Sequence, residues 1–504
     1  MMSSFLSQYL KSLGGAEPNT AAAAYYASLD HIASVNPKVV STILAELRAQ
    51  RGNLKLIASE NYSSLATQLA MGNLFTDKYA EGYPEHRFYA GCENVDSVEL
   101  EAASQAKQLF GCDHAFVQPH SGADANMIAF MAILGWKVQD KFLAENELKS
   151  VNDCSEAQWK KLRELMHGER MLGLDYYCGG HLTHGYRFNI SAQMFESYHY
   201  AVHPETKLLD YEQIRKQAHE IKPLILLAGY SAYPRAINFR IMREIADEVG
   251  AVLMVDMAHF SGLVAGKVFK DDENPIPHAH IVTSTTHKTL RGPRGGIVLC
   301  QEELREYVDK ACPAVMGGPL PHVIAAKAVA FKEANTPEFQ AYAQKVVDNA
   351  RALAEGFQKE GMQVLTGGTD NHIVLVDVAE TFGITGRQAE DALRIAGFTL
   401  NRNALPFDPN GPWYTSGLRL GTPATTSLGM GEKEMHDIAR IATEVCRNTK
   451  PGTLKSGKPS RAKFELEESV RASAIAQVQD LLKKFPLYPE LSEEILTEPE
   501  LVDA

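Results

Sequence analysis

The sequence predicts an α/β protein with two folded units, a larger one around a mainly parallel sheet and a smaller one after it. Between residues 224 and 255, two near-continuous apolar segments flank an amphipathic one at residues 239–249. This alternation is typical of a parallel sheet covered by helices on both faces. Around Gly367 the composition shifts, and a second strand and helix alternation begins at residue 373. The second observation predicts a separate, smaller C-terminal α/β domain.

Length and composition place the chain among ordinary globular proteins. A chain of 504 residues exceeds what one hydrophobic core serves, so we expect two or three domains. Its formal net charge of −12 argues against a protein that coats nucleic acid or an anionic membrane. No apolar run approaches the roughly 18 residues of a membrane span. We therefore expect a cytoplasmic protein without a nucleic-acid or membrane partner.

The seven cysteines are scattered, odd in number, and show neither a disulfide framework nor paired Cys-x-x-Cys metal spacing. A reducing compartment and mostly core thiols are the expectation. No metal site is predicted.

Three domains are expected along the chain. An N-terminal arm with helices covers residues 1–75, in which a loose alanine-rich arm precedes a helix capped by Asn36. The large domain covers residues 76–360 and carries an inserted helical segment at 136–172. The small domain covers 361–504, and its tail beyond about residue 450 holds a basic linker and a helix near 464–485.

A turn of small residues after an apolar strand at 115–117 is a candidate anion site. Ser121, Gly122 and Ala123 lead into an apolar helix at 127–134. Free backbone N–H groups and the helix dipole at such a start attract a phosphate. The turn lacks both the Walker Gly-Lys-Ser/Thr ending and the Gly-x-Gly-x-x-Gly pattern, so it is a weak signal alone.

The segment at residues 78–89 is dense in hydroxyls, charges and aromatic rings and lacks helical periodicity. It is either a satisfied surface loop or a site loop that offers the carboxylate of Glu81 and the phenols of Tyr79 and Tyr89.

Two further polar clusters follow. His181 and His184 lie in a glycine-rich stretch that is either a metal site, with a poor zinc signature, or a lid over a planar ligand. Asp256 ends an apolar strand, where ligands of parallel sheets gather, with His259 three residues on. This aspartate either serves a ligand or merely caps the following turn.

Two cationic residues are further candidates for a functional site. Arg419 is the one charge in an apolar strand pattern, and it either snorkels at an edge or clamps a carboxylate. Lys288 lies between two short strands, in a turn with hydroxyls and with Arg291 and Arg294 nearby. Like charge and burial lower a lysine pKa, which makes Lys288 either a carbonyl nucleophile or part of a solvated basic loop.

One ligand uses these parts together. Pyridoxal 5′-phosphate (PLP) needs a lysine for a Schiff base, an acid for its ring nitrogen, a phosphate cradle and a stacking partner. Lys288, Asp256, the turn at Ser121 and the ring of His181 supply these four parts. Their joint presence predicts a PLP site.

The motifs resemble those of serine hydroxymethyltransferase, in order over residues 50–450. They are Lys78-Tyr-Ala-Glu-Gly-Tyr-Pro, Gln118-Pro-His-Ser-Gly, Gly179-Gly-His-Leu-Thr-His-Gly, Val255-Asp-Met-Ala-His and Thr285-Thr-His-Lys-Thr-Leu-x-Gly-Pro-Arg-Gly-Gly. The resemblance implies a fold-type-I PLP enzyme with a seven-stranded sheet in its large domain. It also implies a homodimer or larger assembly that interconverts serine and glycine, with tetrahydrofolate as co-substrate, through an aldimine and a quinonoid.

The resemblance implies roles for matching residues. The expected catalytic residues are Lys288, Glu81, His181, His259, Thr285 and Tyr89. The expected cofactor-binding residues are Lys288, Asp256, His181, Ser121, Gly122, Ala123, Ser231, His259 and His287, with Gly318 and Tyr79 given across the dimer. The expected substrate-binding residues are Ser59, Arg419, Glu81, Tyr89, Asn403, Gly180 and Tyr176.

Glu81 is expected to come from the neighbouring subunit and to exchange a proton with the serine hydroxyl or folate. Arg294 matches a family position near the cofactor, whereas Arg291 does not. Ala123 stands where the family usually has serine, which removes one hydroxyl from the phosphate turn.

The alternative function is a folate-independent PLP enzyme, such as a 3-hydroxy amino acid aldolase or a racemase.

Overall fold

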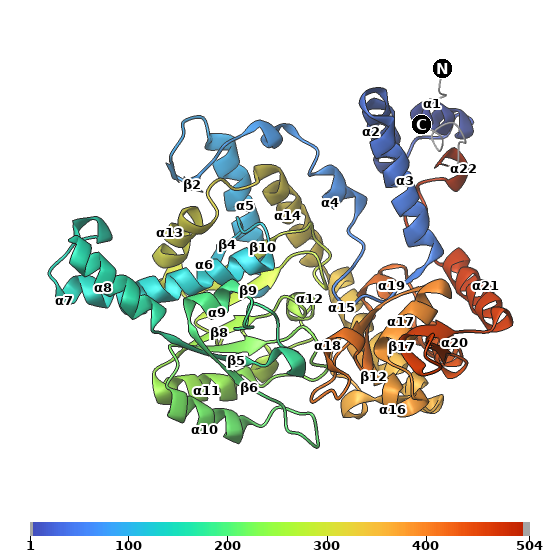
Figure 1. The fold of residues 1–504 in the computed structure, drawn as a ribbon. Helices are drawn as coiled ribbons and strands as arrows, with labels where there is room; N and C mark the ends of the chain where they lie inside the picture. The colour runs from blue at the N-terminus through green and yellow to red at the C-terminus, as the bar shows by residue number, and fades with distance from the viewer. Residues whose placement is uncertain (1–3, 497–504) are drawn as a thin grey trace.

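The computed structural model describes residues 4–496, and Figure 1 shows their fold. The outer ends of the first and last predicted domains, at residues 1–3 and 497–504, lie outside the described residues. The larger unit is built on a seven-stranded sheet of order β4-β10-β9-β8-β7-β5-β6. Its strands are β4 (His114–Phe116), β5 (Arg170–Leu174), β6 (Glu196–Tyr200), β7 (Ile225–Gly229), β8 (Val252–Asp256), β9 (Ile281–Thr285) and β10 (Gly296–Cys300).

The sheet is mainly parallel, which confirms the predicted fold class. Strands β9, β8, β7, β5 and β6 run parallel in that order, and β10 is antiparallel to both of its neighbours. Parallel strands bring their carboxyl ends to one edge of the sheet. Asp256 and the loop after β9 therefore lie at the same edge.

Helices bury both faces of this sheet. Along β8, Leu253 and Val255 belong to one hydrophobic cluster and Val252 and Met254 to another, because successive strand residues point to opposite faces. The first cluster includes residues of α5 (Glu93–Phe110), α10 (Tyr211–Ile221), α11 (Phe239–Val249) and α14 (Pro321–Ala334). The second includes residues of α6 (Gly122–Leu134), α8 (Glu156–His167) and α13 (Arg305–Val315).

The predicted inserted segment begins where α6 passes through a π-helical turn (Gly135–Gln139) into α7 (Asp140–Glu145), followed by α8. Figure 1 shows α7 and α8 projecting from one side of the larger unit. Both helices agree with the predicted helical pattern. The helical prediction up to residue 172 is wrong at its end, since residues 170–172 lie in β5 and enter the central sheet.

The smaller unit has a four-stranded sheet of order β11-β12-β15-β14. Its strands are β11 (Gln363–Val364), β12 (Ile373–Asp377), β14 (Asn401–Asn403) and β15 (Gly417–Gly421), and helices α15 (Pro337–Lys359), α17 (Gly386–Ile395), α20 (Glu432–Arg447) and α21 (Glu468–Lys484) share its hydrophobic cluster. The predicted helix at 464–485 starts later than expected. Residue Phe464 instead lies in β17 (Pro459–Glu465), which forms a hairpin with β16 (Lys450–Thr453) where a linker was expected.

The prediction of a loose N-terminal arm is wrong. Helices α1 (Phe5–Ser12), α2 (Thr20–Val35) and α3 (Pro37–Gly52) form an ordered group with its own hydrophobic cluster, completed by residues 487–496 of the tail. Alanine favours helix, and the Asn19 side chain caps α2 by accepting a hydrogen bond from Ala22 N. Asn36 precedes α3 as expected but makes no side-chain cap bond.

Several short strands and helices connect the larger elements. After α3, β1 (Leu54–Lys55) pairs in parallel with β13 (Phe398–Thr399) of the smaller unit. The hairpin of β2 (Gly82–Tyr83) and β3 (His86–Arg87) precedes α5. The shorter helices are α4 (Leu65–Leu69), α9 (Ile190–Met194), α12 (Ser261–Ala265), α16 (Val378–Phe382), α18 (Gly411–Tyr414), α19 (Pro423–Ser427) and α22 (Glu493–Leu496).

Five of the seven cysteines are buried, and the other two are partly buried, so the expectation of core thiols is confirmed.

Within residues 4–496, no helix combines the length and the apolar character needed to cross a bilayer.

Candidate active site

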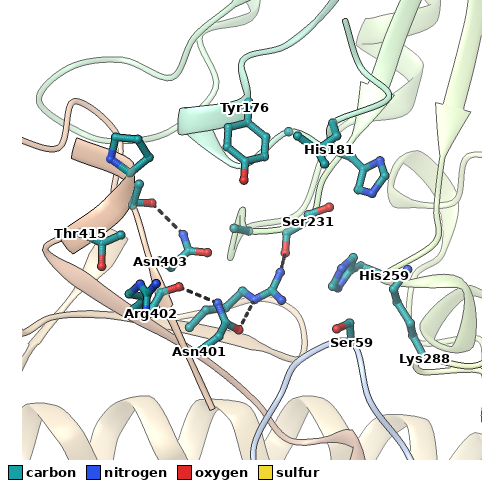
Figure 2. A pocket seen from close by; sticks show the side chains of 16 residues that line it. Ser59, Tyr176, His181, Ser231, His259, Lys288, Asn401, Arg402, Asn403 and Thr415 are labelled. Carbon is teal, nitrogen blue, oxygen red and sulfur yellow. Dashed lines mark hydrogen bonds between the residues drawn. The ribbon is translucent and has the colours of Figure 1, made fainter. Parts of the chain in front are cut away.

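A pocket opens between the carboxyl edge of the large sheet and the strands β14 and β15 of the smaller unit (Figure 2). Nine of the predicted site residues line it together. They are Ser59, Tyr176, Gly180, His181, Ser231, His259, Lys288, Asn403 and Arg419. Sequence reasoning had placed these residues in one site although they come from stretches more than 300 residues apart.

Lys288 lies in the loop after β9 and faces the pocket (Figure 2). Its Nζ donates a hydrogen bond to Thr285 Oγ1 at 3.2 Å, and Asn61 holds its backbone carbonyl at 2.9 Å. Burial lowers the pKa of Lys288 to about 8; Asp256 opposes this effect, and the charges of Arg419 and Arg294 add to it. Lys288 therefore loses its proton at a lower pH than an ordinary lysine, and a carbonyl nucleophile needs this neutral amine.

The two arginines near Lys288 differ in their surroundings. Arg294 contributes to the lowered pKa of the lysine. The guanidinium of Arg291 instead lies 4.6 Å from the ring centroid of Tyr342. That only Arg294 belongs near the site stays an expectation.

Asp256 ends β8 and is held by three donors. Its Oδ2 accepts hydrogen bonds from Asn126 Nδ2 at 2.9 Å and from the ring of His184 at 3.1 Å, and its Oδ1 accepts from Ala258 N at 3.0 Å. Burial alone would raise its pKa, but His184, the charge of His181 and the bond from Asn126 together hold the pKa well below the usual range. The carboxylate both caps its turn and remains ionised as a buried acceptor.

The histidine stretch has a carboxylate neighbour that is far from it in the sequence. His181, His184 and Asp256 place one candidate ligand atom each within 4.8 Å of one another. The nearest carboxylate oxygen is already engaged by His184 and Asn126, and His181 Nδ1 lies 2.8 Å from Thr183 Oγ1. Burial lowers the pKa of His181 to about 4, so its ring is neutral and suited to stack on a planar ligand.

The small-residue turn begins its helix earlier than expected. Ser121 is the N-cap of α6 and accepts a hydrogen bond from Asp124 N at 3.2 Å, so Gly122 and Ala123 lie in the first turn. A Cβ on Gly122 would lie 2.7 Å from Thr285 Cγ2. The helix start therefore touches the residue that binds Lys288.

Two buried histidine nitrogens near this helix start lack a partner among the described residues: Nε2 of His120 and Nδ1 of His287. A buried polar atom without a partner costs free energy, so both nitrogens are open to a hydrogen bond from a ligand bound here. Lysine, ionised aspartate, helix N-terminus and neutral imidazole thus converge, and the residues present fit PLP.

Arg419 rises from the middle of β15 and reaches across to the larger unit. Its Nη1 donates to the carbonyl of Ser231 at 2.7 Å and its Nε to Asn401 Oδ1 at 3.1 Å. Burial lowers its pKa to about 10, and no ion pair joins it to an acid within residues 4–496. A guanidinium enclosed without a counter-ion is set to receive a carboxylate, and the snorkelling alternative is excluded.

His259 has a partner that the sequence did not reveal. Its ring stacks on that of His372 with centroids 5.5 Å apart, and their facing nitrogens are 3.3 Å apart. Burial holds the pKa of His259 well below the usual range and lowers that of His372 to about 3, so both rings are neutral. His372 precedes β12, over a hundred residues from His259, and no local motif marks it.

The sequence did not identify four further residues in or beside the site. Three of them line the pocket, Asn401, Arg402 and Thr415, and the fourth, Asn126, binds Asp256.

Ten of the nineteen predicted site residues do not line this pocket. Six of them, Asp256, Thr285, His287, Ser121, Gly122 and Ala123, belong to β8, β9, the loop after β9 and the start of α6, described above. The other four are Glu81, Tyr79, Tyr89 and Gly318. Three of them still lie together. The rings of Tyr79 and Tyr89 make an edge contact at 4.9 Å, and a Cβ on Gly318 would lie 3.2 Å from Tyr79 Cζ. Both tyrosine rings are exposed.

A model of the serine hydroxymethyltransferase family matches residues 32–150 and 149–442. The chain belongs to the serine hydroxymethyltransferase family. The serine hydroxymethyltransferase of Treponema pallidum is 58% identical over 496 residues, which cover 98% of this chain and 86% of that protein. The serine hydroxymethyltransferase of Mycolicibacterium smegmatis is 58% identical over 475 residues, 94% of this chain and 96% of that protein.

A third relative bears on the inserted segment at 136–172 and on the tail beyond about residue 450. The serine hydroxymethyltransferase of Chlamydia trachomatis serovar D is 52% identical over 497 residues, which cover 98% of this chain and 100% of that protein. Since both chains align along almost their whole length, the α7–α8 segment and the tail are not peculiar to this chain.

Proposed function

We propose that this chain is a PLP-dependent glycine hydroxymethyltransferase. It converts serine and tetrahydrofolate into glycine, 5,10-methylenetetrahydrofolate and water, and it runs in both directions. The observation that carries this proposal is the pocket that holds Lys288, with its lowered pKa, and Arg419, with no acidic partner among the described residues. An amine for an aldehyde beside a cation for a carboxylate suits an α-amino acid.

PLP would be held by residues of this pocket together with Asp256, the loop after β9 and the start of α6. Lys288 is the amine that would attach its aldehyde, and Asp256, held ionised, would pair with the protonated ring nitrogen. His181 would lie on the ring, with Ser231, His259 and His287 around it. Ser121, Gly122 and Ala123 would hold the phosphate at the start of α6. When bound, PLP supplies an electron-accepting ring that stabilises negative charge at the amino-acid α carbon.

The substrate would be oriented by both units. Arg419 would bind its carboxylate, with Ser59 beside it in the same pocket. Because Asn401 and the Ser231 carbonyl fix two of the guanidinium N–H groups, the remaining ones are aimed into the pocket. Thr285 would hold the Lys288 amine in place and carry no charge that could quench it.

Folate would enter from the side of the smaller unit. Asn403 and Tyr176 line this part of the pocket, with Gly180 close to the cofactor side. The ring of Tyr176 lies 4.7 Å from that of Tyr186, which gives the entrance an aromatic wall on which a planar pterin can stack.

The working form is proposed to be a homodimer with shared sites. Glu81 would exchange a proton with the serine hydroxyl or the folate, Tyr89 would assist exchange at the lysine, and Tyr79 and Gly318 would touch the cofactor, all from the neighbouring subunit. Support comes from exposed apolar side chains within residues 74–100, since Leu74, Tyr79, Phe88, Tyr89 and Leu100 all face solvent in one chain. Such exposure marks an interface. The dispersed buried thiols support a cytoplasmic location.

The direct test is glycine formation from serine with and without tetrahydrofolate, after addition of PLP. The proposal expects turnover that rises strongly with tetrahydrofolate and is abolished in Lys288→Ala. Serine cleavage that tetrahydrofolate does not accelerate would instead assign a folate-independent aldolase. A purified protein that stays colourless with added PLP would refute the PLP site itself.

A further inference from the structure

Arg87 is a buried arginine outside the pocket. It belongs to β3 of the hairpin β2–β3, which packs beside the start of α5 (Figure 1). Its side chain is only 4% exposed. The proposed mechanism gives this residue no role, yet burying a guanidinium is costly unless every N–H group is used.

Arg87 donates hydrogen bonds to the backbone carbonyls on either side of Glu81. Its Nη1 donates to the carbonyl of Ala80 at 2.9 Å and to the carbonyl of Gly82 at 3.0 Å, on either side of Glu81. The carbonyl of Glu81 itself accepts from Phe88 N at 3.0 Å. Three consecutive carbonyls are thus fixed, and the direction in which the Glu81 side chain leaves the backbone is fixed with them.

The other side of the guanidinium is anchored on α5. Its Nε binds Asp96 at 2.8 Å and its Nη2 binds Glu99 at 2.6 Å. These acids are three residues apart, so they face the same side of the helix. A planar fork can satisfy two carboxylates and two carbonyls together, which a lysine ammonium cannot.

A second side chain repeats part of this arrangement. Gln118 Nε2 donates to Glu99 Oε1 at 2.6 Å and to the Gly82 carbonyl at 2.9 Å. Gly82 also has a φ of 99°, and a Cβ there would lie 2.3 Å from the His86 carbonyl oxygen. The backbone at Glu81 is therefore held by a glycine conformation and by two side-chain donors.

We propose that Arg87, paired with Glu99, is a positioning residue that sets the geometry of Glu81 for proton exchange with the serine hydroxyl. This inference rests on the proposed function. Arg87 touches neither substrate nor cofactor, and it acts through the peptide that it holds. The geometry belongs to one chain, so it holds whichever subunit's pocket Glu81 serves.

Two reactions of the same PLP-loaded enzyme separate positioning from general damage. Serine cleavage needs proton transfer at the hydroxyl, whereas exchange of the glycine α proton with deuterated solvent does not, because glycine has no hydroxyl. The double variant Arg87→Met/Glu99→Leu removes both of the deeply buried charges. The remaining acid, Asp96, has a side chain that is 20% exposed and can be solvated. We expect the kcat of the double variant for serine to fall about 10- to 100-fold while glycine exchange stays within about threefold.

Arg87→Lys is the second variant, since it keeps a charge opposite Glu99 but cannot hold both carbonyls. The same split, of smaller size, is expected for it. The matched control is Arg51→Lys: Arg51 also binds backbone carbonyls, those of Leu487, Tyr488 and Leu491, but outside the pocket. Both of its rates are expected to stay near wild type.

Serine turnover near wild type in both variants, or an equal loss in the two reactions, would overturn the role of Arg87. A wild-type enzyme that neither cleaves serine nor exchanges the glycine proton would instead refute the proposed function. The two failures are therefore distinguishable.

Discussion

At the scale of single residues, two cations define what the pocket can accept. Arg419 and Lys288 both line it, and their charges add to burial in lowering the pKa of His259, which lines the same pocket. Arg419 has no acid beside it within the described chain, so it is the residue proposed to bind the substrate carboxylate. Lys288 has a lowered pKa, so an aldehyde-bearing cofactor finds a neutral amine. The surroundings of each cation thus match one ligand group, a carboxylate for Arg419 and an aldehyde for Lys288.

Arg419→Ala is expected to raise the KM for serine about 10- to 100-fold, with a smaller change in kcat, because charge-assisted hydrogen bonds to the carboxylate are lost. Steady-state kinetics measure the split. Arg440→Ala, on the exposed side of α20, is the control and should change neither constant. An unchanged KM in Arg419→Ala would remove that residue from substrate binding.

The pKa of Lys288 predicts how the apoenzyme takes up PLP. Only the neutral amine attacks the aldehyde, and burial lowers the pKa to about 8. The rate of uptake should therefore rise about tenfold per pH unit below pH 8 and level off above it. Stopped-flow absorbance over a pH series measures this. A rate that still rises steeply beyond about pH 9.5, toward the usual lysine range, would show an unperturbed amine.

At the level of elements, substitutions in α8 test whether the α7–α8 segment is part of the packed core. Leu162 is fully buried against the second face of the large sheet, and Leu165 on the same helix is 40% exposed. Leu162→Ala should lower the free energy of unfolding by about 2–4 kcal/mol through the cavity it leaves. Leu165→Ala should change it by less than about 0.5 kcal/mol.

Urea unfolding of the two variants gives these free energies. Both should retain the kcat of the wild type, because α8 contributes nothing to the pocket. Equal stability of Leu162→Ala and wild type would mean that this helix does not pack as described.

Elements with strong local signals were predictable, and weakly patterned ones were not. The helix at 239–249 has a clear apolar face and ends at a left-handed glycine, Gly250, so its bounds follow from pattern alone. Strands β5 and β6 were missed, because β5 follows a charged helix directly and β6 carries the polar sequence Glu-Ser-Tyr-His-Tyr. In the sheet, β5 is placed by its pairing with β7 and β6 by its pairing with β5, and both are long-range contacts.

The site divides in the same way. Lys288, Asp256 and His181 lie in motifs whose chemistry is local, so sequence alone identified them. The bond from Asn126 to Asp256 and the stacking of His372 on His259 join residues over a hundred positions apart. Such contacts depend on how β8, α6 and β12 pack, which no local pattern encodes.

At the scale of the whole molecule, shared sites predict that two inactive variants restore each other. Lys288→Ala lacks the amine and Glu81→Gln lacks the proton donor. In a mixed dimer, one site receives the intact lysine of one chain and the intact glutamate of the other. Unfolding and refolding an equal mixture should give about a quarter of wild-type turnover, since about half of the dimers are mixed and each has one intact site.

Each variant refolded alone should stay inactive, and turnover of the mixture is the measurement. A mixture as inactive as its parts would mean that Glu81 does not act across an interface.

The fate of the serine β carbon distinguishes transfer to tetrahydrofolate from cleavage without folate. Serine labelled at this carbon is incubated with the PLP-loaded enzyme and tetrahydrofolate, and the products are followed by NMR. The account predicts unlabelled glycine, label in 5,10-methylenetetrahydrofolate, and neither product with Lys288→Ala. Label that appears as free formaldehyde at the same rate with or without tetrahydrofolate would contradict it.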